Sequence, residues 1–453
     1  MESINPATGK KIKFYAEFSS QKIHHILNQA ERSFQLWRRQ SFKERGQKMK
    51  KAAQILRKNK EHYARLMAEE MGKPLVQGHS EVEKCAWGCD FYAQEAEHYL
   101  SAELIKTDAA KSFVTYEPLG IVLAVMPWNF PFWQVFRCAA PTLMAGNGIL
   151  LKHASNVCGC ALAIEEVFKD AKFPDGLFRS LLIPGKKIGS LIEHPLIQAV
   201  TLTGSTQAGK AIASKAGALI KKTVLELGGN DPYIILADAD LEQTVQVCVA
   251  SRLINGGQSC VAAKRFIAVE SILKKFTEKF VEKMRAQRMG LPMELDTTLG
   301  PLARHDLRDQ LHSQVQKSIK QGAKLLLGGE IPENSGAYYP PTVLTNVRRG
   351  MPAYAEELFG PVAVILKAKN EQEAVTIAND TAFGLGAAIF TRDVKRGEHI
   401  AAKELQAGCC FVNDFVKSDP RLPFGGIKQS GYGRELSSFG IREFVNIKTV
   451  YIK

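Results

Sequence analysis

Apolar residues recur at helical spacing in the first hundred positions of the chain. The pattern predicts helices at about residues 20 to 40, 43 to 71 and 80 to 102, and Gly72-Lys73-Pro74 ends the second. β-Branched and aromatic residues become frequent from Ser112 to Val125, around a turn at Glu117-Pro118-Leu119-Gly120. This second pattern predicts a hairpin.

Short apolar runs then alternate with helical patterns. The runs lie at 149–152, 180–183 and 199–203, and the helices after them at 157–171, 186–194 and 206–217. Repeated strand-helix units of this length predict a parallel, doubly wound sheet. Leu227-Gly228-Gly229 marks the crossing into a second α/β region, residues 228 to about 425.

Length and composition indicate a soluble α/β protein of two or three domains. The chain has 453 residues, of which 45% are hydrophobic. No apolar run reaches the roughly 20 residues of a membrane span, and the N-terminus has no signal pattern, so we expect a cytoplasmic protein. Nine cysteines, without partners at zinc-site spacing, predict neither a disulfide framework nor a metal site.

The formal net charge of +14 raises the question of an anionic partner. The densest basic stretch, Lys43 to Lys60, has apolar residues at helical spacing between its charges, as in the solvated face of an amphipathic helix. We therefore expect neither nucleic acid nor membrane as a partner.

Candidate chemistry begins with Cys260 and Glu226. Cys260 follows a glycine-rich turn that lets a substrate approach the thiol, and Glu226 precedes Gly228-Gly229. A thiol and a carboxylate suggest covalent catalysis with a separate general base. A third element, Asn129, lies in a rigid turn between Pro127 and Pro131, where its amide can donate to an oxyanion.

Five motifs together resemble the aldehyde dehydrogenase superfamily in order and spacing, over nearly the whole chain from Asn5 to Val450. They are Pro127-Trp128-Asn129-Phe130-Pro131, Leu225-Glu226-Leu227-Gly228-Gly229, Gly257-Gln258-Ser259-Cys260, Glu356-Glu357-Leu358-Phe359-Gly360-Pro361 and Pro423-Phe424-Gly425-Gly426-Ile427-Lys428-Gln429-Ser430-Gly431. The resemblance implies an α/β fold with a Rossmann-like dinucleotide-binding domain, an α/β catalytic domain and a small oligomerisation element.

The resemblance also implies a mechanism. The Cys260 thiolate attacks an aldehyde carbon, and the Asn129 amide and the Cys260 N–H hold the oxyanion. Hydride then leaves for the nicotinamide, and Glu226 activates water to hydrolyse the thioester. Many relatives have a second glutamate before the C-terminal Lys-Thr-Val as a proton acceptor, and Asn446 stands there, which leaves the proton route open.

The resemblance implies a cofactor site as well. Its residues are Trp128, Lys152, Ser155, Gly204, Ser205, Leu227, Glu357 and Phe359. In relatives that prefer NAD, a glutamate at the Ser155 position repels a 2′-phosphate. Ser155 lacks that charge and Lys152 can pair with the phosphate, so we expect NADP to be accepted, with NAD usable.

Two rival readings come from other classes of protein. Residues 204 to 211, Gly-Ser-Thr-Gln-Ala-Gly-Lys-Ala, come within one residue of a P-loop, and Asp238 could supply its magnesium ligand. Ala211 lacks the hydroxyl that a P-loop needs, and phosphoryl transfer does not need the Cys, Glu and Asn set. A catalytically inactive scaffold is the other alternative, but both Cys260 and Glu226 are present.

We expect succinate semialdehyde as the substrate, with another small aldehyde as the alternative. Arg137 among aromatic residues is either a structural cation or a carboxylate receptor, and in succinate-semialdehyde dehydrogenases an arginine there contacts the substrate carboxylate. The sequence around Arg137 resembles a bacterial branch of that group. Ser418 could supply a further hydrogen bond to the substrate. A second arginine of other members is Ile254 here.

The resemblance divides the chain into three parts. Residues 1-102 and 119-227 form the dinucleotide-binding domain, 228-425 the catalytic domain, and 103-118 and 426-453 the oligomerisation segments. Because the last two segments reach a neighbouring subunit in the family, we expect a homodimer or a homotetramer.

Overall fold

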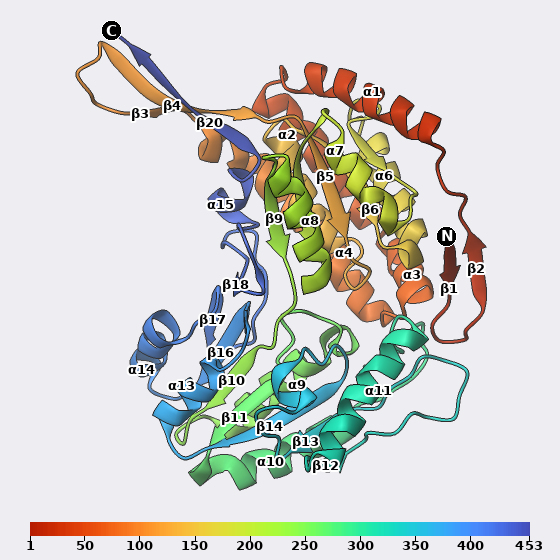
Figure 1. Cartoon of the computed structure of the whole chain (residues 1–453), viewed down its shortest axis with the longest axis vertical. Coiled ribbons are helices and arrows are strands. Elements are labelled where there is room, and N and C mark those ends of the chain that lie inside the picture. Colours follow the sequence, from red (N-terminus) through yellow and green to blue (C-terminus); the bar gives the residue numbers. More distant parts are fainter.

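Two large sheets carry the fold, and a smaller third sheet projects from it (Figure 1). The computed structural model describes residues 1–453. The first large sheet has the order β19 (Gly431–Tyr432), β9 (Lys222–Glu226), β8 (Ile197–Thr203), β5 (Ile121–Met126), β6 (Gly148–His153), β7 (Phe178–Ser180). All its neighbours are parallel except β19. The prediction of a parallel, doubly wound α/β sheet is confirmed.

Successive residues of the central strands pack on opposite faces of this sheet. Ile121, Leu123 and Val125 of β5 belong to one hydrophobic cluster, with α1 (Ser20–Trp37), α7 (Ile188–Glu193) and α8 (Thr206–Ala218). Ala124 and Met126 belong to the other, with α2 (Phe42–Lys58), α3 (Lys60–Met71), α4 (Leu75–Leu100), α5 (Trp133–Met144) and α6 (Cys158–Asp170). Helices on both faces are what parallel strands of near-continuous apolar sequence require.

The second large sheet lies below the first in Figure 1. Its order is β12 (Lys324–Leu327), β13 (Thr342–Thr345), β14 (Val362–Ala368), β11 (Arg265–Val269), β10 (Pro232–Ile235), β16 (Gly386–Phe390), β17 (Cys409–Val412). The remaining helices of this half are α9 (Leu241–Leu253), α10 (Glu270–Arg285), α11 (His305–Lys320), α12 (Pro352–Ala355), α13 (Glu371–Asn379) and α14 (Val394–His399). α10 and α13 pack on its strands.

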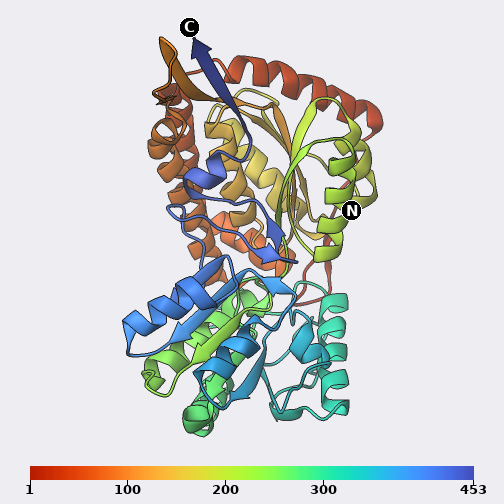
Figure 2. The ribbon, with the colours of Figure 1, turned by 60° about the vertical axis from the view of Figure 1, so that its left-hand side comes forward.

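The third sheet forms an arm at the top of the molecule, which Figure 2 shows from another side. It consists of β3 (Glu103–Leu104), β4 (Lys111–Pro118) and the C-terminal β20 (Val445–Ile452). The short helix α15 (Ser437–Ile441) comes just before β20 in the chain. Two small pairs complete the fold, β1 (Glu2–Ile4) with β2 (Lys11–Phe14) and β15 (Phe383–Gly384) with β18 (Ile427–Lys428). None of the helices is both long and apolar enough to cross a membrane.

Two local predictions are wrong. The segment from Ser112 to Val125 is no hairpin, because β4 pairs with β20 in the arm while β5 pairs with β6 and β8 in the first sheet. The helix predicted at 43 to 71 is two helices. They meet at Asn59, whose backbone (φ −104°, ψ 19°) leaves the helical region.

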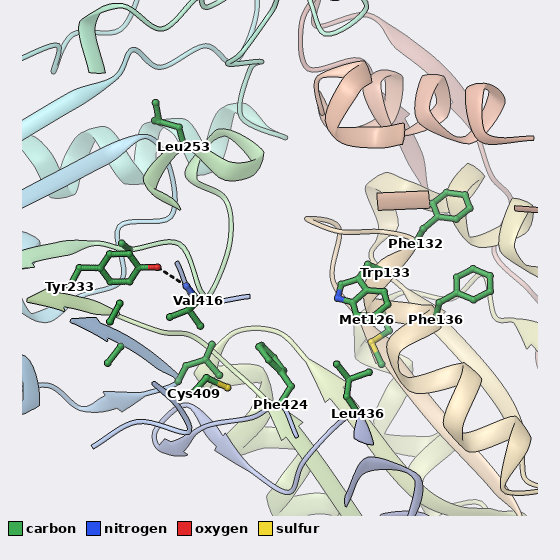
Figure 3. Packing of buried hydrophobic residues seen from close by; sticks show 14 of the residues in the cluster. Met126, Phe132, Trp133, Phe136, Tyr233, Leu253, Cys409, Val416, Phe424 and Leu436 are labelled. Atoms are coloured by element: carbon green, nitrogen blue, oxygen red, sulfur yellow. Dashed lines mark hydrogen bonds between the residues drawn. The ribbon is translucent and has the colours of Figure 1, made fainter. Parts of the chain in front are cut away.

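Figure 3 shows buried apolar side chains from both halves of the molecule. Phe132, Trp133 and Phe136 come from the first half, and Val416 and Phe424 from the second. The Tyr233 hydroxyl accepts a hydrogen bond of 2.8 Å from the Val416 N–H, which fixes the chain after β17. The candidate site lies at this junction.

Candidate active site

Cys260 lies where two cavities meet. A cavity of about 520 Å³ lies on one side and a cavity of about 300 Å³ on the other. Cys260 and Gln134 are the only residues that line both. We call the larger one the nucleotide cavity and the smaller one the substrate cavity.

The turn before Cys260 depends on residues that tolerate a left-handed backbone. Asn255, Gly256 and Gly257 have φ values of 53°, 64° and 76°. A Cβ on Gly257 would lie 2.3 Å from the Gly360 carbonyl oxygen, so only glycine permits this contact. After the turn, the Lys264 ammonium donates to the carbonyl oxygens of Ser259 (2.9 Å) and Cys260 (2.6 Å). The thiol therefore sits on a tightly held loop.

Asn129 lies beside this loop with its amide oriented by two hydrogen bonds. Its Nδ2 donates to the Gln258 carbonyl oxygen at 3.0 Å, and its Oδ1 accepts from Gln134 Nε2 at 3.1 Å. One Nδ2 hydrogen stays free, and the Cys260 N–H donates to no acceptor in the chain. These are two donors suited to an oxyanion next to the sulfur.

The resting thiol is protonated. Burial raises the pKa of Cys260 to about 12, although the charges of Arg137 and Lys264 act in the opposite direction. Attack on a carbonyl needs the thiolate, so the proton must be removed when a substrate is present.

Glu226 is buried at the end of β9 and lines neither cavity. Neither of its carboxylate oxygens has a hydrogen-bond partner. A Cβ on Gly425 would lie 2.6 Å from Glu226 Oε1, so the carboxylate rests against that glycine. Burial and the neighbouring Glu435 raise the pKa of Glu226 well above its usual value. To reach Cys260 as a base, the side chain must turn away from Gly425 and act in its ionised form.

Glu435 is a site residue that the sequence analysis missed. It is buried, forms an ion pair with Arg137, and is the charge with the largest effect on the pKa of Glu226. The sequence could have indicated this residue, because Gly433-Arg434-Glu435-Leu436 lies just after the recognised motif at 423–431. Asn446, by contrast, is exposed in β20 opposite Glu117. Asn446 lines neither cavity.

Six of the eight predicted cofactor residues line the nucleotide cavity. They are Trp128, Gly204, Ser205, Leu227, Glu357 and Phe359. The Trp128 and Phe359 rings meet edge to face at 5.8 Å between centroids. Glu357 accepts from the Gly229 N–H at 3.0 Å and pairs with Lys264 at 3.3 Å.

Lys152 and Ser155 do not line this cavity. Lys152 lies near the end of β6, and Ser155 opens the short 3-10 helix that follows. Because β5, β6 and β8 are parallel, both residues share the carboxyl edge of the sheet with Trp128 and Gly204. This edge is where open α/β sheets bind dinucleotides.

The N-terminus of α8 suits a pyrophosphate and does not form a P-loop. The Ser205 hydroxyl caps the helix by accepting from the Ala208 N–H at 3.2 Å. The N–H groups of Thr206 and Gln207 stay free for an anion. Gly209 lies inside the helix, where a Cβ would be 2.6 Å from Leu227. Asp238 binds Thr391 and nearby amides beyond β10, in the other sheet, so the proposed magnesium ligand is not on this sheet.

Arg137 and Ser418 both line the substrate cavity. Arg137 Nη2 donates to Gln134 Oε1 (3.1 Å) and Thr203 Oγ1 (3.2 Å), and the guanidinium lies over the Phe424 ring. Ile254 lines the cavity as an apolar residue. The cavity nevertheless has a second cation, the half-buried Lys84 of α4, which the sequence analysis missed because only the packing of α4 on α5 brings it there.

Comparison with known proteins agrees with this geometry. The model of the "Aldehyde dehydrogenase family" matches residues 1–450. A probable succinate-semialdehyde dehydrogenase [NADP(+)] of Synechocystis sp. is 50% identical over 450 residues, covering 99% of each chain. The succinate semialdehyde dehydrogenase [NAD(P)+] of Escherichia coli is 49% identical, over 99% of this chain and 97% of its own.

Solved structures are similar over the whole chain. The succinic semialdehyde dehydrogenase of Streptococcus pyogenes, in complex with NADP+, has a TM-score of 0.97 at 36% identity, with 100% of this chain and 99% of that chain covered. A structure of Gox0499, described in terms of cofactor and substrate selection, has a TM-score of 0.98 at 39% identity with the same coverage.

Proposed function

Because the chain belongs to the aldehyde dehydrogenase family, we propose that it oxidises succinate semialdehyde to succinate with NADP, and accepts NAD as well. The observation that carries the proposal is the position of Cys260 between two separate cavities. A thiol reached by a nucleotide from one side and by an aldehyde from the other suits hydride transfer from a carbon held on sulfur.

Cys260 Sγ gives up its proton to solvent, attacks the aldehyde carbon and forms a thiohemiacetal oxyanion. The free hydrogens of Asn129 Nδ2 and of the Cys260 N–H hold this oxyanion. NADP held in the nucleotide cavity would supply the hydride acceptor, and Cys260 would then hold the substrate as a thioester. Glu226 turns from Gly425 and takes a proton from the water that attacks this thioester, and Arg137 favours its ionised form.

The nucleotide cavity fits the cofactor by its own chemistry. It combines the free N–H groups at the start of α8 for a pyrophosphate with Glu357 for a ribose and the Trp128 and Phe359 rings. Lys152 and Ser155 are proposed to bind the adenine-ribose end. Lys152 is buried without an ion pair, which suits a 2′-phosphate.

The substrate assignment rests on the relatives and on charge. Both named relatives are succinate-semialdehyde dehydrogenases. The substrate cavity holds Arg137 and Ser418, our proposed substrate-binding residues, among aromatic side chains. A small aldehyde with a carboxylate at its far end matches a cavity with these groups.

The arm supports a proposed homodimer or homotetramer. It exposes large apolar side chains along β3 and β20, among them Leu104, Ile447 and Tyr451. Such side chains on a projecting sheet suit burial against another copy. We also propose the division into 1-102 with 119-227, 228-425, and 103-118 with 426-453, and a cytoplasmic location.

The test is an assay of the purified protein with carboxylated and neutral aldehydes, with NADP or NAD, followed at the nicotinamide absorbance. We expect the highest kcat/KM for succinate semialdehyde with NADP. Cys260→Ala should abolish oxidation while the nucleotide still binds. Normal turnover by this variant would contradict the mechanism, and a higher kcat/KM for another aldehyde would contradict the substrate.

A further inference from the structure

We propose that Lys84 and Ser418 together form the receptor for the substrate carboxylate, an inference that rests on the proposed function. The sequence analysis assigned this task first to Arg137. The substrate cavity contains two cations, and their surroundings distinguish them.

Lys84 is a half-buried cation without a counter-charge. Its ammonium lies over the Trp133 ring, 4.7 Å from the centroid, and donates one hydrogen bond, to Ser418 Oγ at 2.9 Å. It forms no ion pair. Burial, reinforced by the nearby Arg137 charge, lowers the pKa of Lys84 to about 8. A buried charge is normally paired, so an anion is missing from this arrangement.

The Ser418 hydroxyl is left with only a donor. Its oxygen accepts from Lys84 Nζ and, at 3.0 Å, from the Trp133 indole Nε1. These two bonds occupy both lone pairs, so the hydroxyl hydrogen must point to an acceptor elsewhere. Figure 3 shows the Trp133 nitrogen turned toward the side on which Val416 lies, just before Ser418. The ammonium and the hydroxyl thus offer hydrogens at one place.

The carboxylates near Lys84 are already engaged. Glu81 pairs with Lys73 through one oxygen, and its other oxygen accepts from the N–H groups of Phe132 and Trp133 at 2.9 Å. Asp419 holds Arg421 with both oxygens. No protein group is therefore left to supply the missing anion, and a ligand in the cavity can.

Arg137 differs in each respect. It pairs with the buried Glu435 and donates to Gln134 and Thr203. Its charge is compensated before any substrate arrives. Cys260, Lys84 and Ser418 line one cavity, so an aldehyde whose carbonyl lies at the sulfur has its other end in the same space.

Lys84→Met tests the receptor, because methionine keeps the length of the side chain and removes its charge. KM for succinate semialdehyde should rise roughly tenfold to a hundredfold, the effect of losing a charge-assisted hydrogen bond. KM for butanal, which has the same four carbons without the carboxylate, should change less than twofold. Ser418→Ala should give a smaller rise, and Lys84→Arg should retain part of the discrimination.

Lys417→Met is the matched control. Lys417 lines the same cavity but already pairs with Asp414 at 2.6 Å, so both KM values should stay unchanged. An unchanged KM for succinate semialdehyde in Lys84→Met, or an equal rise for butanal, would overturn the receptor.

Binding to Cys260→Ala protein, measured by calorimetry, separates this inference from the proposed function. Succinate semialdehyde should bind, and adding Lys84→Met should weaken binding roughly tenfold or more. If Lys84-dependent binding is present but the wild-type protein does not oxidise this aldehyde, the receptor stands and the proposed function fails. If the wild-type protein oxidises succinate semialdehyde normally but Lys84→Met does not weaken its binding, the receptor proposal is wrong and the proposed function stands.

Discussion

Two groups of charges lie around the substrate cavity, and they are built differently. The Arg137 group, with Glu435 and Glu226, is buried and closed, because the arginine has its own carboxylate. The Lys84 group, with Ser418, is open, because no acidic side chain pairs with the ammonium. A compensated charge positions its neighbours, whereas an uncompensated one is available to a ligand.

Lys152, which we propose to bind the adenine-ribose end of the nucleotide, resembles Lys84. Burial lowers its pKa, and it forms no ion pair. Both open cations stand where we propose that a ligand anion binds. The comparison therefore predicts that changes in the closed group affect catalysis and stability, while changes in the open groups affect the choice of ligand.

The largest effect is expected from Glu226→Gln in the closed group. Burial raises the pKa of this carboxyl, and glutamine keeps its shape without a charge, so the protein should fold normally. Turnover should fall roughly 10²- to 10⁴-fold, the usual contribution of a general base, after an initial burst of reduced nucleotide. Stopped-flow absorbance measures the burst. Steady turnover at the wild-type rate would remove Glu226 from the mechanism.

Arg137→Met should destabilise the fold. It leaves Glu435 buried beside Glu226 without a cation, which costs about 3–5 kcal/mol of the free energy of unfolding. Adding Glu435→Gln should recover most of the loss in urea denaturation. A single variant as stable as the wild type would show that the pair is not the closed unit described here. The double variant is also the background in which to test Arg137 as a substrate-binding residue.

Lys84 should give kcat/KM for succinate semialdehyde a pH dependence that butanal lacks. The charged groups around it each have a partner of their own: Asp419 pairs with Arg421, Glu81 with Lys73 and Arg137 with Glu435, while burial raises the pKa of the Cys85 thiol. The ammonium is charged below its pKa of about 8 and neutral above it. The kcat/KM for succinate semialdehyde should therefore fall as pH rises through 8, by roughly tenfold per pH unit well above 8. Matching profiles for the two aldehydes would contradict this assignment.

Ser155→Glu should have the smallest effect, on the choice of nucleotide. The new carboxylate can pair with Lys152 and repels a 2′-phosphate, so kcat/KM with NADP should fall about tenfold more than with NAD. Ser155→Ala is the control, because it removes the hydroxyl without adding charge. Equal losses with both nucleotides in Ser155→Glu would place the discrimination at other residues.

Local pattern was enough to predict the alternating strands and helices of the first sheet, since each unit is coded by neighbouring residues. The local pattern gave a wrong prediction from Ser112 to Val125, because the partner strands β20 and β8 lie far away in sequence. Two apolar runs joined by a turn have the same sequence pattern whether the two strands belong to one sheet or to two different sheets. The sequence also did not predict the break between α2 and α3 at Asn59, because apolar residues continue at helical spacing through it.

The site divides in a similar way. Cys260 and Asn129 stand in motifs whose backbone geometry is local, so their sequence context was informative. Lys84 has no such context. In the sequence, Lys84 is one of several charged residues on an amphipathic helix. Only the packing of α4 against α5 brings it into contact with Trp133 and Ser418. The role of a charged residue here depends on whether its partner is elsewhere in the fold, which no local pattern records.

The two cavities share only Cys260 and Gln134, and this has a kinetic consequence. Every other lining residue belongs to one cavity alone, so two ligands bound there would share contacts at these two side chains only. Under the proposed function, a substitution in the lining of one cavity should therefore change the KM of one ligand and leave the KM of the other nearly unchanged.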